Sequence, residues 1–443
     1  MKKMVNVRNT ALCSVLAASM LVGCAGIGNI NTVSSKSAEK EQPSEQKKAE
    51  NDSNSENKKE QVSVIGVEYS GDFNKSLVSY VEKNGFSEEN YMVSPTSLRA
   101  ALALAVAGAD TDTKEELIHA MGFENVGEVN AWYTSVTQMI TDFDTYIEED
   151  QKFFESQKQW MSDDAKGPEG KLVMLNSIWN NTDLNGKFGK DFVKYVKKNY
   201  SSEAYEVGAK DFTEKANKWV SDGTNGLIPS ISSDMSNVNA ALINTLYLKS
   251  SWVNTFEEYA TKSDTFTTVK GEQVQKEFMN QEDRFSFYED EKGKLIVLPL
   301  NGRINAVFVL GEIDDIHDAM NKAAYEDVIV KLPKFEVESA FVENELIDFL
   351  QKRGAGLAFT DNADFSVMCP DAFWMITDII QKTKIKIDED GIEAAAATAI
   401  MMCESALMVE DKPKEFIADK PFKFYICGGE NNAEMLFCGQ VVK

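Results

Sequence analysis

Histidine is nearly absent from this chain of 443 residues, which contains only His119 and His317. Two histidines leave little room for a His-rich metal site or a typical Ser-His-Asp triad. Proline and glycine are also scarce, with 9 and 26 residues, and this excludes collagen-like and proline-rich classes. Basic side chains number 46 against 71 acidic ones, so the net charge is -25. Such a chain repels the phosphates of nucleic acids, and we expect no nucleic-acid partner.

Cysteines are too few for a disulfide scaffold. Beyond the N-terminal region only Cys369, Cys403, Cys427 and Cys438 remain. Cys427 and Cys438 flank a turn-rich stretch, where either a bridge across a hairpin or two small buried side chains would fit. No CxxC or other metal-ligand spacing occurs. We therefore expect neither a metal nor a cofactor.

The N-terminus has the pattern of a targeting segment. A basic start is followed by the apolar run Ala11–Val22, which is too short to span a bilayer as a mature helix. Leu21-Val22-Gly23-Cys24 resembles a bacterial lipobox, in which Cys24 is lipidated and becomes the mature N-terminus. An ordinary secretory signal with a chance cysteine is the alternative. Residues 1–23 are thus predicted to be a lipoprotein signal peptide, and the protein to be an extracytoplasmic cell-surface lipoprotein or a secreted protein.

A polar stretch follows the predicted signal. From about residue 33 to residue 61 the chain consists mainly of Ser, Lys, Glu, Gln and Asn, and such a segment cannot bury enough apolar surface to fold. We expect residues 24–61 to be a lipid-anchored disordered tether. No second linker of this kind interrupts residues 62–443, which are predicted to form one domain.

Secondary-structure signals in that domain indicate an α+β fold. Ser94-Pro95 is a helix start, and the nearly all-apolar Leu98–Ala107 after it predicts a helix buried on all sides. Residues 143–170 are polar and acidic and are expected to form a surface excursion. Lys294–Leu300 and Asn305–Leu310 are predicted to pair around Asn301-Gly302. Helices occur mainly early and strands late, rather than in a regular βαβ repeat.

One segment near the C-terminus is unusual. Thr383–Ile387 alternates like a half-buried strand, and an acidic turn then leads into Ile392-Glu393 and a run of alanines. An uncharged apolar stretch, 399–403, follows. A short helix leading into a loop would explain the alanines alone, but ordinary exposed loops are not composed like the stretch after them.

At these residues the chain resembles the serpin family. The resemblance begins with Asp388-Glu389-Asp390-Gly391-Ile392-Glu393-Ala394-Ala395-Ala396-Ala397-Thr398, which looks like the mobile hinge of that family. Further motifs follow the family order from about residue 65 to the end. They are Val93-Ser94-Pro95-Thr96-Ser97, the pattern over 217–228, Asn244-Thr245-Leu246-Tyr247-Leu248-Lys249-Ser250-Ser251-Trp252, Leu332-Pro333-Lys334-Phe335, Ala363-Asp364-Phe365-Ser366, and the two C-terminal motifs at 418–422 and 436–439.

The resemblance implies the serpin fold, with three β-sheets, about nine helices and an exposed reactive-centre loop. It also implies an irreversible suicide-substrate inhibitor of serine proteases that is not an enzyme. The target protease cleaves the loop and is held as a covalent acyl-enzyme. The loop then inserts as a strand into the central sheet. A monomer attached to the membrane through Cys24 is expected.

The same resemblance assigns roles to particular residues. The predicted hinge comprises Glu389, Gly391, Ile392, Glu393, Ala394, Ala395, Ala396, Ala397 and Thr398. Trp252, Lys334 and Glu389 are expected to form the breach, where insertion begins, while Ser94, Ser97, Asn244 and Gln381 are expected in the shutter. With a strand period of two, Ile392, Ala394, Ala396 and Thr398 share one small, largely apolar face, and Glu393 lies on the other.

Three departures from the family pattern stand out. Ile392 occupies a position where inhibitory members usually have Thr or Ser, and Gln381 replaces a shutter histidine found in many members. The loop between Gly391 and Pro421 is also a few residues longer than usual. Counting from Gly391 places the reactive bond at Ser405-Ala406, with neighbours from Met402 to Met408 left open.

The composition of the loop restricts the target. No Lys or Arg occurs between Lys386 and Lys412, so a protease that needs a positive side chain is an unsuitable target. Small or apolar residues fit elastase-like, subtilisin-like or chymotrypsin-like proteases. The alternatives are a non-inhibitory serpin, a lipid-anchored solute-binding protein and a secreted hydrolase. The last is disfavoured by the few histidines and the lack of a GxSxG motif.

Overall fold

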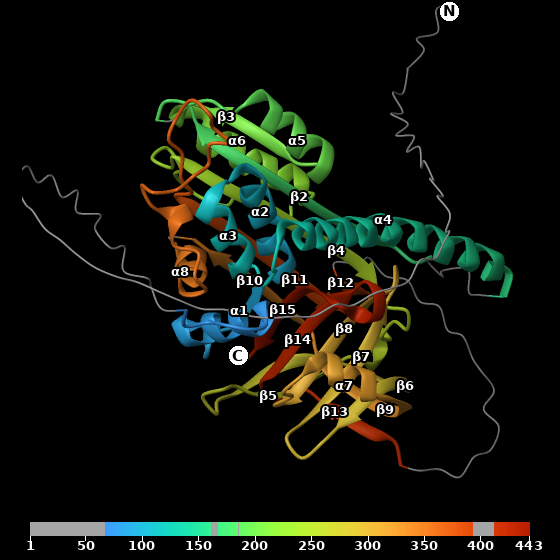
Figure 1. The fold of residues 1–443 in the computed structure, drawn as a ribbon. Coiled ribbons are helices and arrows are strands. Elements are labelled where there is room, and N and C mark those ends of the chain that lie inside the picture. The colour runs from blue at the N-terminus through green and yellow to red at the C-terminus, as the bar shows by residue number, and fades with distance from the viewer. Residues whose placement is uncertain (1–66, 161–166, 185, 343, 393–411) are drawn as a thin grey trace, which may run out of the picture. The chain divides into compact units, whose positions relative to one another are not determined.

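The computed structural model describes residues 67–160, 167–184, 186–342, 344–392 and 412–443 (Figure 1). These residues belong to a compact unit that spans Ser63–Lys443. The predicted signal peptide and tether lie outside the described residues.

Eight α-helices occur within the described ranges. They are α1 Phe73–Val81, α2 Pro95–Gly108, α3 Thr111–Ala120, α4 Val126–Gln157, α5 Lys190–Tyr200, α6 Ala209–Gly223, α7 Ile316–Lys322 and α8 Glu345–Lys352. Ser94 caps α2 as the sequence predicts, because its side chain accepts a hydrogen bond from the backbone N–H of Ser97.

One of the two sheets formed by the described strands has six strands in the order β10-β11-β12-β4-β2-β3 and contains several of the predicted site residues. Their bounds are β2 Gly170–Asn181, β3 Glu203–Val207, β4 Ala240–Ser251, β10 Phe335–Phe341, β11 Asp378–Asp388 and β12 Gly391–Ile392. We call this sheet the six-stranded sheet.

A nine-stranded sheet contains the remaining strands. They are β1 Tyr91–Val93, β5 Lys262–Thr267, β6 Gln273–Glu289, β7 Gly293–Leu300, β8 Ile304–Gly311, β9 Ala324–Pro333, β13 Lys414–Ile417, β14 Phe422–Gly428 and β15 Glu434–Val441. The strands β7 and β8 pair antiparallel around residues 301–303, which confirms the predicted hairpin.

The described strands form two hydrogen-bonded sheets, where three were expected. The difference comes from β6, which has 17 residues. It pairs with β5 and β9 along most of its length and with β7 at its end. A single long strand thus joins what would otherwise be two separate sheets, and the α+β fold class is unaffected.

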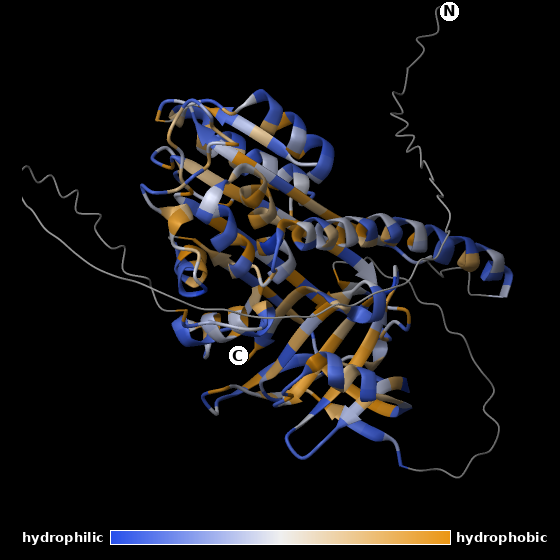
Figure 2. Ribbon diagram, in the orientation of Figure 1, coloured by the Kyte–Doolittle hydropathy of each residue, from blue (hydrophilic) through white to orange (hydrophobic). Residues whose placement is uncertain are grey.

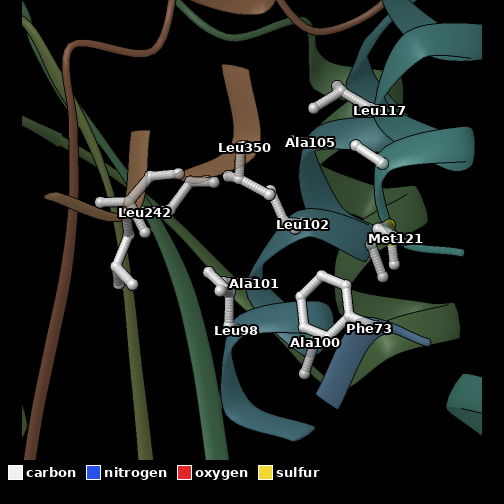
Figure 3. Close-up of a cluster of buried hydrophobic side chains, with 14 of the residues drawn as sticks. Phe73, Leu98, Ala100, Ala101, Leu102, Ala105, Leu117, Met121, Leu242 and Leu350 are labelled. Atoms are coloured by element: carbon white, nitrogen blue, oxygen red, sulfur yellow. The ribbon is translucent and has the colours of Figure 1, made fainter. Parts of the chain in front are cut away.

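The core is built around α2. Figure 3 shows Leu98, Ala101, Leu102 and Ala105 of this helix among side chains from other elements, with Leu242 of β4 nearby. Residues 98–106 of the helix are almost all buried, which confirms the predicted buried helix. Figure 2 shows the same contrast between the hydrophobic interior and hydrophilic outer helix faces. Because α2 packs against the six-stranded sheet, it fixes the position of β4.

The predicted surface excursion over residues 143–170 is wrong for its first half. Residues 143–157 continue α4, a helix of 32 residues. Phe143, Ile147 and Phe154 are buried and follow helical spacing along one face. The many acidic residues between them concealed this stripe.

Neither a membrane-spanning helix nor a metal-binding group of side chains occurs among the described residues. No helix there is long and apolar enough to cross a membrane. That part of the chain also contains no group of three or more His, Cys, Asp or Glu side chains placed to hold a metal ion.

Candidate functional site

The strands β4 and β11 are paired at one end and separated at the other. Residues 378–380 of β11 pair parallel with 241–243 of β4. Farther along, Gly391 and Ile392 of β12 lie between the two strands, opposite Ser251 and Ser250 on one side and Asp388 and Ile387 on the other. Residues 244–249 and 381–386 are not joined to each other by a described ladder. We call this stretch the opening.

The register is the same on both sides of the opening. Ile380 lies opposite Ile243, and Ile387 lies opposite Ser250 across β12, so the offset between β4 and β11 does not change. A strand that continued β12 would therefore meet residues 249 to 244 and 386 to 381 in order. The strands β4 and β11 thus separate without a change of register.

Gly391 is required at the entrance to the opening. Its φ is +144°, and a Cβ there would lie 2.3 Å from the carbonyl oxygen of Ser250. Only glycine combines this backbone conformation with such close approach to a neighbouring strand. The hinge glycine singled out from the sequence thus allows β12 to fit between β4 and β11.

Ile392 faces the core. Its side chain is 2% exposed and belongs to the same apolar cluster as Leu248, Ile385 and Ile387. The β-branched isoleucine at this unusual position therefore packs well in a strand.

The predicted breach residues lie together in the structure. The Lys334 ammonium is 2.9 Å from the Glu389 carboxylate, whose side chain is 9% exposed. The Thr261 hydroxyl donates a 2.7 Å hydrogen bond to the same carboxylate. The Trp252 indole N–H donates to the Asp388 carbonyl oxygen at 2.9 Å, and the Trp252 backbone N–H donates to the Asp390 carbonyl oxygen at 3.0 Å. These contacts hold the segment that leads into β12.

The breach charges are mutually stabilised. Burial opposes ionisation of Glu389, but hydrogen bonds from Lys334 and Thr261 outweigh it and lower the pKa of this carboxyl. The hydrogen bond to Glu389 raises the pKa of Lys334 despite its partial burial. Both groups are therefore charged at neutral pH.

Replacing Glu389 should weaken this end of the sheet in a pH-dependent way. We expect Glu389→Gln to lower the free energy of unfolding at pH 7 by about 1–2 kcal/mol, the value of a hydrogen bond to a charged group. The pKa of Glu389 is lower in the folded protein than in the unfolded chain, where it is about 4.5. Ionised Glu389 therefore stabilises the folded protein above about pH 4.5, and this stabilisation is lost as the pH falls through the pKa of the folded state. Urea unfolding should thus show a constant difference between pH 7 and about pH 5.5 that shrinks below about pH 4.5.

The matched control is Glu336→Gln, because Glu336 pairs with Lys384 at 2.7 Å but is 51% exposed. That variant should change stability by less than about 0.5 kcal/mol at any pH. An equal loss in both variants, or a Glu389→Gln deficit that persists undiminished at about pH 4, would contradict the assignment of the breach ion pair.

The predicted shutter residues form a buried polar chain below the opening. The Ser94 hydroxyl donates to the Leu436 carbonyl oxygen at 2.6 Å. The Ser97 hydroxyl hydrogen-bonds to the Asn244 side chain, and Asn244 hydrogen-bonds to Asn176. All of these side chains are buried. The chain of bonds connects α2 to β4 and β2.

Gln381 binds the start of α2 rather than Asn244. Its side-chain oxygen accepts from the Ser94 backbone N–H, and its amide group donates to the Ser94 carbonyl oxygen, both at 2.9 Å. The amide thus satisfies one buried donor and one buried acceptor at once. Because a glutamine amide does not titrate, this contact has no charge change near neutral pH.

Removing the Gln381 amide should strongly destabilise the protein. Gln381→Leu leaves the Ser94 N–H buried without this partner, which costs about 1–3 kcal/mol, and removes one of two hydrogen bonds to the Ser94 carbonyl, which keeps the Leu98 N–H at 3.1 Å. We expect a loss of ~2–4 kcal/mol in urea unfolding. Gln275→Leu is the control, because Gln275 is exposed and hydrogen-bonds only near the surface. A loss below about 1 kcal/mol in Gln381→Leu would refute the role of this amide.

Several buried residues of this region were missed by the sequence analysis. The Thr383 hydroxyl donates to the Met92 carbonyl oxygen at 2.7 Å, and the Asn176 amide donates to the Tyr133 hydroxyl at 3.0 Å. Thr383 could have been found, because it lies two residues after Gln381 on the same face of a strand. Asn176 and Thr261 gave no such signal, since their partners are distant in sequence.

Other predicted residues lie outside the described residues. These are Cys24, the hinge residues Glu393, Ala394, Ala395, Ala396, Ala397 and Thr398, Cys403, and the reactive-bond residues Ser405 and Ala406. Cys369, Cys427 and Cys438 are free and buried, so no bridge joins Cys427 to Cys438. In the β14–β15 ladder Cys438 is opposite Tyr425 and Cys427 is opposite Met435. Burial raises the pKa of the Cys427 thiol to about 12.

Comparisons with known proteins agree with this geometry. The family model described as Serpin (serine protease inhibitor) matches residues 68–443. An uncharacterised serpin-like protein of Thermococcus kodakarensis is 28% identical over 377 residues, covering 80% of this chain and 81% of its own. The leukocyte elastase inhibitor of Bos taurus is 26% identical over 381 residues, covering 80% and 92%.

Solved structures share the fold. The crystal structure of a highly specific serpin from the insect Tenebrio molitor has a TM-score of 0.65 at 26% identity and covers 84% of this chain and 96% of its own. The native state of the thermophilic serpin tengpin has a TM-score of 0.67 at 24% identity, with coverage of 85% and 94%. With most of the described chain matched by the family model, this protein belongs to the serpin family.

Proposed function

We propose that the protein inhibits serine proteases by offering residues 399–409 as bait and inserting the cleaved loop between β4 and β11. The observation that carries this proposal is the opening. It is flanked by strands in constant register, and its entrance already holds Gly391 and Ile392. Two neighbouring strands that are not paired with each other can gain a complete set of ladder hydrogen bonds when a strand is added between them.

The chain after Ile392 has the side-chain pattern that the opening needs. Continuing the β12 register would bring Ala394 opposite Leu248 and Ile385, both buried in the core. Ala396 would then meet Leu246 and Thr383, and Thr398 would meet Asn244 and Gln381. Most of these side chains are buried, and Asn244 hydrogen-bonds to Ser97 of α2, so small side chains would cause no clash on this face.

The opposite face of the opening is basic. Glu393 would lie between Lys249 and Lys386 in the same register, on the outer face of the sheet. Both lysines already form ion pairs, Lys249 with Glu169 at 2.7 Å and Lys386 with Asp388 at 2.8 Å, and their side chains are 27% and 52% exposed. A further carboxylate between them at the surface gains at most a small favourable interaction. The alternation of alanine and glutamate thus agrees with the two faces of the sheet.

The covalent step is ordinary acyl transfer by the protease. Its serine hydroxyl attacks the carbonyl carbon of Ser405, the bond to the Ala406 nitrogen breaks, and that nitrogen takes up the proton. The ester between the protease and Ser405 is then held as the loop inserts. Ser405 is a substrate position in this scheme, and the inhibitor contributes no catalytic residue.

The bait should select proteases with small or apolar specificity pockets. We expect elastase-like and subtilisin-like proteases to give an SDS-stable complex and to release a C-terminal peptide that begins near Ala406. A trypsin-like protease should give no complex at this loop, because the bait has no Lys or Arg. Gel electrophoresis and mass spectrometry of the released peptide measure both results. Digestion by all of these proteases without any complex would favour a non-inhibitory serpin.

A further inference from the structure

A cavity of about 1010 Å³ opens beside the breach. Its walls come from the last turns of α4, the segment after β4, the middle of β6 and the β7–β8 turn. Figure 1 shows the end of α4 reaching past β12 and β4. The cavity therefore depends on the C-terminal part of α4, where the sequence predicted only a surface excursion.

The charge of the cavity is negative. Four carboxylate residues line it, namely Asp150, Glu257, Glu282 and Asp283, against the single cation Arg303. Arg303 is already engaged, because its guanidinium is 3.7 Å from the Glu149 carboxylate and 3.9 Å from the centre of the Tyr146 ring.

None of the four carboxylates forms an ion pair with another described residue, and two of them accept hydrogen bonds from neutral groups. Asp150 accepts a hydrogen bond from the Gly302 backbone N–H at 3.3 Å, and Asp283 accepts one from the Asn254 amide at 2.9 Å. Among the described residues, Glu257 and Glu282 take part in no ion pair. The cavity thus attracts cations.

The cavity also presents apolar surface to solvent. Phe153 is 54% exposed, Val253 is 49% exposed and Tyr259 is 83% exposed, and all three line the cavity. Exposed aromatic side chains next to uncompensated carboxylates are typical of surfaces that bind other molecules. A simple cation would leave this apolar wall uncovered.

We propose that this cavity binds a basic peptide segment of a partner protein, in which Arg or Lys alternates with apolar residues. The cationic side chains would lie near Glu257 and Glu282, and the apolar ones near Phe153 and Tyr259. The volume is at the upper end of the range for small-ligand pockets, about 300–1,000 Å³, which suits several peptide residues. The Gln281 side-chain oxygen, which has no hydrogen-bond partner, is a further acceptor at this wall.

The cavity lies beside the segment that leads into the predicted bait. Trp252 lines the cavity and also holds the backbone at Asp388 and Asp390. A partner bound here would lie next to the segment that leads into the bait. The proposal is nevertheless independent of inhibition, because binding requires neither cleavage nor insertion.

The test uses the intact chain and a hexapeptide of alternating arginine and leucine that carries an uncharged fluorophore. Fluorescence anisotropy should show binding that weakens about tenfold between low and moderate salt. The same peptide with citrulline in place of arginine should bind at least about tenfold more weakly, because it lacks the charge. Spermidine should displace the arginine peptide poorly, since it cannot cover the apolar wall.

Matched variants locate the site. We expect Glu257→Gln combined with Glu282→Gln to weaken binding about tenfold. Glu115→Gln combined with Glu124→Gln removes the same charge from exposed residues near the other end of α4, and should change binding less than about twofold. Phe153→Ala should weaken binding several-fold, while Phe373→Ala, at a residue 52% exposed, should not.

Some results would overturn the proposal. If the two double variants weakened peptide binding equally, the peptide would be binding through the net charge of the protein rather than at this cavity. Equal binding of the citrulline peptide, or displacement by spermidine at the same concentration as by the peptide, would remove the basis for a basic apolar partner. None of these measurements involves a protease, so failure here is distinguishable from failure of the inhibitory function.

Discussion

Ala394→Glu should abolish inhibition and turn the protein into a substrate of its target protease. If the inserted loop continues the register of β12, residue 394 would face inward between Leu248 and Ile385, which are 5% and 3% exposed. An unpaired carboxylate buried there costs about 3–5 kcal/mol, and a barrier raised by even half of this slows insertion more than about tenfold. The measurement is the ratio of SDS-stable complex to cleaved inhibitor.

The control is the same substitution one residue later. In Ala395→Glu the carboxylate would face outward near Lys384, beside a hollow of about 390 Å³ whose lining includes Tyr247 and Lys249. This variant should keep most of the complex formation of the parent protein. Loss of inhibition in both variants would show only that the hinge tolerates no charge. Retention in both would contradict insertion in the register of β12.

Cleavage of the bait should make the protein more resistant to heat. Residues 393–398 would gain ladder bonds to both β4 and β11, and each net hydrogen bond contributes about 0.5–1.5 kcal/mol. Burial of the inward alanines adds to this, while ordering the backbone costs about 1–2 kcal/mol per residue. With further residues inserted, we expect Tm to rise by ~10 °C or more.

Calorimetry of intact and nicked protein at equal concentration measures this rise. The nick should be made by a protease that cleaves within 402–408 and leaves the rest of the chain intact, as mass spectrometry can verify. Nicked Ala394→Glu should show a much smaller rise than nicked Ala395→Glu. If nicked parent protein melts at the temperature of the intact molecule, the loop does not enter the sheet, and the inhibitory mechanism is wrong.

Several parts of the site could be predicted from the sequence because they depend on interactions between residues that are close together in the chain. Ser94 and Pro95 begin α2 through capping and a preset backbone angle. Gly391 was singled out within the hinge motif, and the structure gives the reason in its positive φ and its contact with Ser250. Strand alternation placed Ile392 on the core face. Each of these depends on a few consecutive residues.

Other features depend on segments far apart in the chain. Gln381 was expected in the shutter with Ser94 and Asn244, but only the tertiary structure showed that its amide binds the Ser94 backbone at the start of α2. The continuation of α4 to Gln157 was missed, because its apolar stripe of Phe143, Ile147 and Phe154 is diluted by acidic residues. The cavity formed by that helix end could not be predicted for the same reason.

The sequence alone determined the caps and the strand faces, since capping, backbone freedom and alternation act between near neighbours, and it predicts the hinge. It also determined the family, through motifs in the family order. Only the tertiary structure decided that β4 and β11 separate in constant register, that Lys334 meets Glu389, and that α4 borders a negative cavity beside the breach. These depend on long-range contacts, and the position of one strand relative to another is set by the packing of the whole sheet on its core.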